Sequence, residues 1–322
     1  MRKPTKGTAG AGARHRPDEG PPIRSAPIVG AAHSRPGGGG LRPELPQPSP
    51  RLFAAFATYS RWYLSRHFHA VRLAGTVPRP DDDAALVVYF NHPSWWDPLV
   101  AIHLARSFFP ERTAYGPIDA AALGRYGFFE KLGFFGVEAG TVAGARRFLA
   151  VAEALAAEPA TALWITPEGR FTDPRQRPVR LRPGLGRLAR RLGEAATAGG
   201  RDAVLLPLAV EYVYWQERFP EVLLTFGEPL SAARLAADLG SAGATATATA
   251  TAWDGRLAAA LETAQDDLAE RAVARDPAAF EVLVGGRAGV SGVYDLWQAV
   301  KGFVTGNRYL REHGGESGGD GA

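Results

Sequence analysis

The stretch AALVVYFNHPSWWD, residues 84–97, joins an apolar run to a short polar segment. The apolar run, residues 84–90, is typical of a buried β-strand. His92 follows the end of this run, and Asp97 lies five residues further on. An imidazole can take up a proton near neutral pH, and a nearby carboxylate fixes its tautomer and stabilises the imidazolium. The stretch therefore predicts a general base, His92, with Asp97 as its partner.

No obvious nucleophile accompanies this pair. The chain has no cysteine and no Gly-x-Ser-x-Gly sequence that would place a serine on a strand-to-helix turn. We therefore expect His92 to act directly on a substrate hydroxyl. The lack of cysteine excludes disulfides and thiol catalysis and fits a reducing compartment. Because histidines are not clustered, we expect no metal site.

The 322 residues are 46% hydrophobic, enough for the core of one large domain or two small ones. The net charge is +4, but residues 1–50 hold eight basic and three acidic side chains. This basic tail favours anionic surfaces such as lipid or nucleic acid, and a solvated leader explains it equally well. We find no apolar run of roughly 18 residues and no signal peptide. We expect a cytoplasmic protein, peripheral on the inner face of the cell membrane.

Composition and periodicity divide the chain into four parts. Residues 1–48 are rich in Gly, Pro and Arg and are predicted to be disordered. An ordered domain spans residues 49–275, with a flexible Ala/Thr insertion at 240–252. Residues 276–311 are interpreted as a docking or membrane-contact segment, and residues 312–322 as a disordered tail.

Predicted strands alternate with predicted helices through the domain. We expect strands at 84–90, 113–115, 134–137, 161–166, 203–210 and 221–226, and helices at 93–106, 119–132, 141–157, 184–198 and 253–275. This alternation is typical of an α/β fold, a central largely parallel or mixed sheet flanked by helices.

An aromatic-rich segment, residues 51–73, precedes the first of these strands. Its aromatic side chains recur at helical spacing and arginines lie among them, so it predicts an amphipathic N-terminal helix. Such a helix can lie in a bilayer interface. A helix packed on the protein core explains the pattern equally well.

Two further loops follow predicted strands and suit an anion. In Pro167-Glu168-Gly169-Arg170, the glycine allows close backbone approach and the arginine offers a planar fork to phosphate. In residues 180–184, Arg182 precedes the N-terminus of a predicted helix, which also favours an anion. Because strand ends gather on one edge of a parallel sheet, a base and an anion clamp can face one substrate.

Taken together, three blocks in order resemble the glycerolipid acyltransferases, the family that contains the lysophosphatidic acid acyltransferases. They are Asn91-His92-x4-Asp97, Pro167-Glu168-Gly169-Arg170 and the proline-containing apolar strand Leu205-Leu206-Pro207-Leu208-Ala209. The resemblance covers roughly residues 80–230. Any long chain can contain His-x4-Asp alone, so the combination carries the resemblance.

The resemblance implies acyl transfer to a lysophospholipid hydroxyl, such as that of 1-acyl-glycerol-3-phosphate, from acyl-CoA or acyl-ACP as co-substrate, with no bound cofactor. His92 is implied as the general base and Asp97 as the residue that orients it. The implied substrate-binding residues are Asn91, Ser94, Glu168, Gly169, Arg170 and Arg182. Backbone amides near Pro93 and Ser94 are candidate oxyanion donors. The implied partners are a membrane lipid surface and the acyl donor, without nucleic acid or an obligate protein partner.

The chain also departs from the family pattern. The second motif, residues 132–140, lacks the usual arginine, for which Arg146 and Arg147 are possible substitutes. Trp95 and Trp96 add bulk to the first motif and either line an acyl or lipid pocket or pack the following helix. These departures leave open a non-glycerol acceptor (a glycolipid, amino-lipid or terpenoid alcohol), a thioester hydrolase, and a catalytically silent membrane-binding protein. His103 is interpreted as structural.

Overall fold

A nine-stranded mixed sheet forms the centre of the computed structural model, which describes residues 43–240 and 246–287. The strand order is β4-β3-β5-β2-β6-β7-β1-β9, and β8 pairs with β6. The strands are β1 (Ala70–Ala74), β2 (Ala85–Phe90), β3 (Thr113–Asp119), β4 (Phe134–Val137), β5 (Thr161–Ile165), β6 (Ala203–Val213), β7 (Glu221–Phe226), β8 (Leu230–Ser231) and β9 (Phe280–Gly285). Strands β4 to β6 along this order pair in parallel, whereas β6 and β7 are antiparallel. The predicted α/β class is confirmed.

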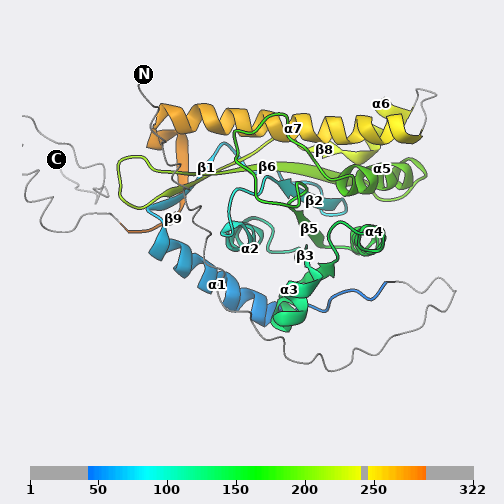
Figure 1. The fold of residues 1–322 in the computed structure, drawn as a ribbon, viewed down its shortest axis with the longest axis horizontal. Helices are drawn as coiled ribbons and strands as arrows, with labels where there is room; N and C mark the ends of the chain where they lie inside the picture. The colour runs from blue at the N-terminus through cyan, green and yellow to red at the C-terminus, as the bar shows by residue number, and fades with distance from the viewer. Residues whose placement is uncertain (1–42, 241–245, 288–322) are drawn as a thin grey trace, which may run out of the picture. The chain divides into compact units, whose positions relative to one another are not determined.

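Helices cover both faces of this sheet (Figure 1). They are α1 (Pro50–His67), α2 (Asp97–Phe108), α3 (Ala120–Arg125), α4 (Val142–Ala157), α5 (Gly184–Thr197), α6 (Ala232–Gly240) and α7 (Ala246–Ala274), with 3-10 turns η1 (Gly127–Leu132) and η2 (Pro277–Ala279). Side chains of β2 alternate between the faces, because successive residues of a strand point to opposite sides. Val87 and Tyr89 pack with α4, α5 and α7, whereas Leu86 and Val88 pack with α1 and α2.

Three predicted helices differ from the observed ones. The helix predicted over 51–73 ends at His67, and residues 70–74 form β1, which is buried between β7 and β9. The helix predicted from Pro93 begins at Asp97, because Asp97 Oδ2 accepts from the Ser94 amide and holds residues 91–96 in a non-helical turn. The segment 119–132 forms α3 and then the separate 3-10 turn η1.

Two low-complexity or apolar segments also form regular structure. Residues 246–252 of the predicted flexible insertion belong to α7, because alanine is the strongest helix former and the segment continues directly into the amphipathic part of that helix. Residues 280–285 of the predicted docking segment form β9, the edge strand paired antiparallel with β1. Residues 43–48 of the predicted disordered N-terminal tail are described without regular secondary structure, and Leu45 packs against the core. Residues 1–42, residues 288–311 and the predicted tail 312–322 lie outside the described residues.

Membrane-spanning length is a separate question from membrane contact. Among the helices that the structure describes, we find none with the length and apolarity needed to cross a bilayer.

Candidate active site

His92 is the second residue after β2, where the parallel strands end. Its Nδ1 atom is 2.6 Å from Asp97 Oδ2, and its side chain keeps 19% exposure. When Nδ1–H donates to the carboxylate, the lone pair is on Nε2, which is then the nitrogen that can accept a proton. The structure thus brings together the two residues that the sequence predicted as base and partner.

Asp97 is fully buried at the first position of α2. Its Oδ2 also accepts from the Ser94 amide at 3.1 Å, and its Oδ1 accepts from the Tyr212 hydroxyl at 2.6 Å. Burial, followed by the nearby Asp97 charge, raises the pKa of Tyr212 well above its usual value, so the phenol keeps its proton and donates. These donors offset the cost of burying the carboxylate and fix its orientation.

Sequence reasoning missed Tyr212, because the predicted strand stopped at Val210 whereas β6 continues to Val213. A signal was available in the alternation along this strand. Tyr212 follows Leu208 and Val210 at a spacing of two, and β2 pairs with β6 up to Phe90 and Leu208. The tyrosine therefore extends the same face just beyond the end of β2.

Asn91 and Glu168, which were predicted to bind substrate, form hydrogen bonds within the protein. Asn91 is buried and exchanges two hydrogen bonds with the backbone of Val210, at 2.8 and 2.9 Å. Glu168 is also buried, and its Oε2 accepts from the His92 amide at 3.3 Å and from Thr172 Oγ1 at 2.5 Å. The Asn91 amide and one carboxylate oxygen of Glu168 thus bond within the protein itself. These hydrogen bonds give both residues a positioning function at the His92 loop, and their predicted contact with substrate stays a prediction.

Glycine is favoured at position 169 for two reasons, its backbone conformation and the nearby Arg182 side chain. Its φ is +62°, in the left-handed region, and a Cβ there would lie 2.4 Å from Arg182 Nε. The Arg182 amide also donates to the Pro167 carbonyl at 2.9 Å, which ties its loop to that of Gly169. The two anion-suited loops predicted from the sequence are therefore in contact.

A large apolar cavity of about 830 Å³ opens beside His92 and Asp97, which both contribute to its wall. Most of the wall comes from apolar side chains of α2, β3, η1 and α4, including Ile102, Ala105, Phe129, Phe148 and Leu149. Three arginines, Arg170, Arg182 and Arg187, line the same cavity and are exposed. The arrangement places an imidazole, a cationic cluster and an apolar space together.

Trp95 and Trp96 do not line this apolar cavity. Trp95 is 56% exposed and stacks on Trp96 with ring centroids 4.2 Å apart. Trp96 packs against Tyr63 and Phe68, at 5.4 and 4.9 Å between ring centroids, and lines a second cavity described below. Trp96 therefore joins α1 to the first motif.

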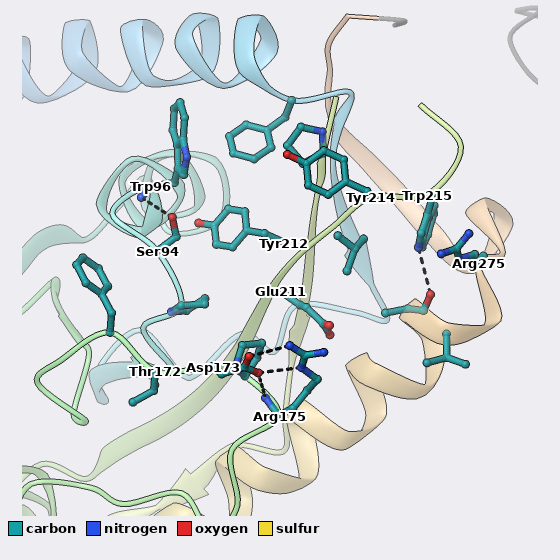
Figure 2. A pocket seen from close by; sticks show the side chains of 18 residues that line it. Ser94, Trp96, Thr172, Asp173, Arg175, Glu211, Tyr212, Tyr214, Trp215 and Arg275 are labelled. Atoms are coloured by element: carbon teal, nitrogen blue, oxygen red, sulfur yellow. Dashed lines mark hydrogen bonds and ion pairs between the residues drawn. The ribbon is translucent and has the colours of Figure 1, made fainter. Parts of the chain in front are cut away.

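The backbone at Pro93 and Ser94 does not offer the free amides that were expected to bind the oxyanion. Pro93 has no amide hydrogen, and the Ser94 amide is already bonded to Asp97. Ser94 Oγ accepts from the Trp96 amide at 3.4 Å, as Figure 2 shows. Ser94 thus shapes the turn that carries His92.

Arg146 and Arg147, considered as substitutes for the missing arginine of the second motif, do not reach the apolar cavity. Both are exposed on α4, and neither lines that cavity. Arg147 Nε donates to the Gly136 carbonyl at 3.0 Å. The second motif therefore brings no arginine to the candidate site.

His103 agrees with its structural interpretation. It is buried on α2, and burial, with a smaller effect from Arg61, lowers its pKa from 6.5 to about 4. In the described part of the chain, no group of three or more His, Cys, Asp or Glu side chains is arranged to hold a metal ion.

Solved structures similar to this chain can be set beside this geometry. No protein-family model matches the chain, and no curated protein matches it. Among solved structures, the chain is similar to the crystal structure of the 1-acyl-sn-glycerophosphate (LPA) acyltransferase PlsC from Thermotoga maritima. The two share 14% sequence identity over 68% of this chain and 79% of that one, with a TM-score of 0.44.

Proposed function

We propose that this protein is an O-acyltransferase that moves a fatty acyl group from an acyl-CoA or acyl-ACP thioester to the hydroxyl of a lipid. The observation that carries the proposal is the His92–Asp97 pair, whose 2.6 Å contact lies in the wall of an 830 Å³ apolar cavity. A base beside an apolar space is the combination that deprotonation of an alcohol next to a fatty acyl chain requires.

In the proposed reaction, His92 Nε2 takes the proton from the acceptor hydroxyl as its oxygen attacks the thioester carbonyl. The carbonyl oxygen carries the negative charge until the carbon–sulfur bond breaks. The departing thiolate then takes from the imidazolium the proton that the acceptor hydroxyl had given up. The buried Asp97 carboxylate stabilises the imidazolium and keeps Nε2 directed at the acceptor. A base positioned in this way contributes about 10²–10⁴-fold in rate.

The apolar cavity is the proposed place of the acyl chain. Its volume lies within the range of about 300–1,000 Å³ that is usual for ligand pockets. Each methylene group moved from water into such a space contributes about 0.8 kcal/mol. Binding of the donor by its chain would therefore bring the thioester to the mouth of the cavity beside His92.

The arginines of the cavity supply the charge that a phosphate-bearing substrate needs. Arg170, Arg182 and Arg187 are exposed and contribute to one wall, so they could contact the phosphate of a lysophospholipid or the phosphates of the donor. A lysophospholipid is the candidate acceptor if these arginines bind its phosphate rather than the phosphates of the donor. A non-glycerol lipid alcohol is the candidate if they bind the donor, because a further cavity near His92 is not predominantly basic.

The surface around α1 supports a peripheral contact with lipid. A continuous series of ring contacts, here called the aromatic band, joins η1 to the first motif through Tyr126, Phe129, Phe128, Phe56, Tyr59, Trp62, Tyr63, Trp96 and Trp95. Trp62 is 51% exposed, with the Arg66 guanidinium 5.3 Å from its ring centroid. Exposed aromatic rings beside arginines are suited to an anionic bilayer interface. Phe53 of α1 and Phe129 also line the apolar cavity, which links this surface to the proposed acyl site.

The proposal is tested by mass-spectrometric profiling of the lipids formed by purified protein. The protein is given palmitoyl-CoA, and separately palmitoyl-ACP, with a mixture of lysolipids and neutral lipid alcohols. An acylated lipid that forms with the wild type and is lost with His92→Ala supports the proposal. Free palmitate formed without any acceptor would indicate a hydrolase instead. No product from either donor would favour a catalytically silent membrane-binding protein.

The membrane contact is tested separately by sedimentation with anionic vesicles. A double variant, Tyr59→Ser with Trp62→Ser, removes exposed rings and should lower the bound fraction. Val142→Ser is the matched control, because Val142 is exposed at the start of α4 and lies outside the aromatic band. Equal binding by both variants would contradict the role proposed for the band.

A further inference from the structure

A second cavity, of about 850 Å³, lies beside the same active-site pair (Figure 2). Its walls come from the end of β6, the loop over residues 171–175 and the end of α7. Unlike the apolar cavity, it combines aromatic rings with charged side chains of both signs, among them Asp173, Arg175, Glu211, Tyr214, Trp215 and Arg275. The proposed mechanism makes no use of these residues.

This cavity adjoins the candidate base. Phe171 lines both cavities, and its ring centroid is 4.4 Å from that of His92. Tyr212 also lines the second cavity, while its hydroxyl bonds to Asp97, which lines the first. The Ser94 amide, which also lines the second cavity, donates to the same Asp97 carboxylate. A ligand in contact with Phe171 in the second cavity would therefore lie one ring away from the imidazole.

The Glu211 carboxylate can accept hydrogen bonds from a ligand in this cavity. It is half-buried on β6 and, among the described residues, has no hydrogen-bond or ion-pair partner. Burial raises the pKa of its carboxyl group, and the nearby Arg175 opposes this effect. Hydrogen-bond donors of a ligand would offset the partial loss of solvation of this carboxylate. Figure 2 shows Glu211 in the interior of the cavity, above Arg175.

The charges of the cavity favour a ligand without net charge. Arg175 is already held by Asp173 through two contacts, at 2.9 and 2.7 Å. A phosphate would meet the unpartnered Glu211 carboxylate, whereas an ammonium group would meet Arg175 and Arg275. Hydroxyl groups can donate to Glu211 and accept from arginine, and the Tyr214 and Trp215 rings offer apolar faces to the carbon skeleton between them.

We propose that this second cavity binds the head group of the acyl acceptor, and that this head group is uncharged and rich in hydroxyls, such as a glycosyl group. The inference rests on the proposed acyltransferase function and assigns the acceptor to its site. Trp96 lines the cavity and belongs to the aromatic band, so the lipid tail of the acceptor can remain at the membrane surface. Arg170, Arg182 and Arg187 then serve the phosphates of the donor.

The test compares three acceptors that share an octyl chain and carry a free hydroxyl: octyl glucoside, octylglycerol phosphate and octyl-hydroxyethyl-dimethylammonium. Transfer from palmitoyl-CoA should have the highest kcat/KM with octyl glucoside. Glu211→Gln should raise KM for octyl glucoside about 10-fold or more, because it weakens hydrogen bonds to a charged acceptor atom. The KM for palmitoyl-CoA should not change. A preference for the phosphate or the ammonium compound would overturn the inference.

Two further variants guard against loss of folding as the cause. Tyr214→Ala removes an exposed side chain of the cavity and should also raise KM for octyl glucoside. Glu270→Gln, at an exposed carboxylate of α7 outside the cavity lining, should leave KM unchanged. An unchanged KM in both Glu211→Gln and Tyr214→Ala would overturn the inference.

Binding without turnover separates this inference from the proposed function. Saturation-transfer NMR with octyl glucoside and no donor should show contact between the sugar protons and the wild-type protein, and weaker contact with Glu211→Gln. Equal signals from both proteins would overturn the head-group site even if acyl transfer occurs. Conversely, transfer that His92→Ala leaves intact would remove the proposed mechanism without bearing on the sugar signals.

Discussion

The Tyr212 hydroxyl donates to Asp97 Oδ1 at 2.6 Å, while Oδ2 of the same buried carboxylate is 2.6 Å from His92 Nδ1. Both carboxylate oxygens are thereby held, one by a phenol from β6 and the other by the imidazole after β2. The relationship joins two strands through the candidate base. It gives Tyr212 a positioning function in the proposed reaction, although it is not required to touch substrate there.

Tyr212→Phe should therefore lower kcat for acyl transfer about 10-fold and leave both KM values near those of the wild type. The reason is that a hydrogen bond to a charged group contributes about 1.5–3 kcal/mol, and about 1.4 kcal/mol is a factor of ten. Steady-state kinetics measure the change. Tyr214→Phe is the matched control, since that exposed phenol on the following loop should be dispensable for kcat. A normal kcat in Tyr212→Phe would show that the phenol does not position Asp97.

Two glycines of the apolar cavity distinguish backbone strain from side-chain crowding. Gly169 and Gly140 both have positive φ, at +62° and +79°, but only at Gly169 would a Cβ meet Arg182. Substitution by alanine should lower the free energy of unfolding by about 1–2 kcal/mol at either position. Only Gly169→Ala should also reduce kcat/KM, because it displaces the guanidinium. Denaturant unfolding and transfer kinetics test this, and an equal loss of kcat/KM in both variants would contradict it.

His103 should make the fold sensitive to acid. Its pKa is lowered from 6.5 to about 4, so between these values the unfolded state binds more protons than the folded state. Stability should then fall as pH drops from 6.5 towards 4, by up to about 3 kcal/mol from this residue. Urea unfolding at several pH values measures the slope. His103→Gln should flatten it, whereas His67→Gln, at an exposed position, should not.

Glu211 should change the stability of the fold with pH in the opposite direction from His103. Burial raises the pKa of its carboxyl above 4.5, so its contribution to stability is present at low pH and is lost as pH rises through the raised value. Glu211→Gln should thus raise Tm at pH 7, and the difference from wild type should vanish below about pH 4. Thermal unfolding across this range gives the measurement. A lower Tm at pH 7 would mean that the carboxylate stabilises the fold.

Much of the fold could be predicted because local signals and tertiary structure agree. The apolar runs that became β2 and β5 are central strands buried on both faces, for which unbroken hydrophobicity is typical. Helix α4 begins where Thr141 caps it through a hydrogen bond to the Gly144 amide. His92 and Asp97 were recognisable because one short segment contains both.

The remaining features depend on contacts between distant segments. Tyr212 reaches Asp97 across 115 positions of sequence, and Asn91 pairs with a backbone 119 positions away. No local pattern specifies such partners. The five residues of β1 are all buried and lack the alternation of a half-exposed strand, so the sequence pattern does not separate them from the preceding helix. The second cavity likewise requires β6, a loop and α7 to be placed together.

The most direct test of the account is the kcat for acyl transfer from palmitoyl-CoA by His92→Ala, compared with the wild type and with His67→Ala. His67 is exposed on α1 and supplies a matched loss of an imidazole outside the proposed chemistry. We expect kcat to fall about 10²–10⁴-fold in His92→Ala, while Tm stays close to that of the wild type and His67→Ala remains active. An unchanged kcat in folded His92→Ala would contradict it.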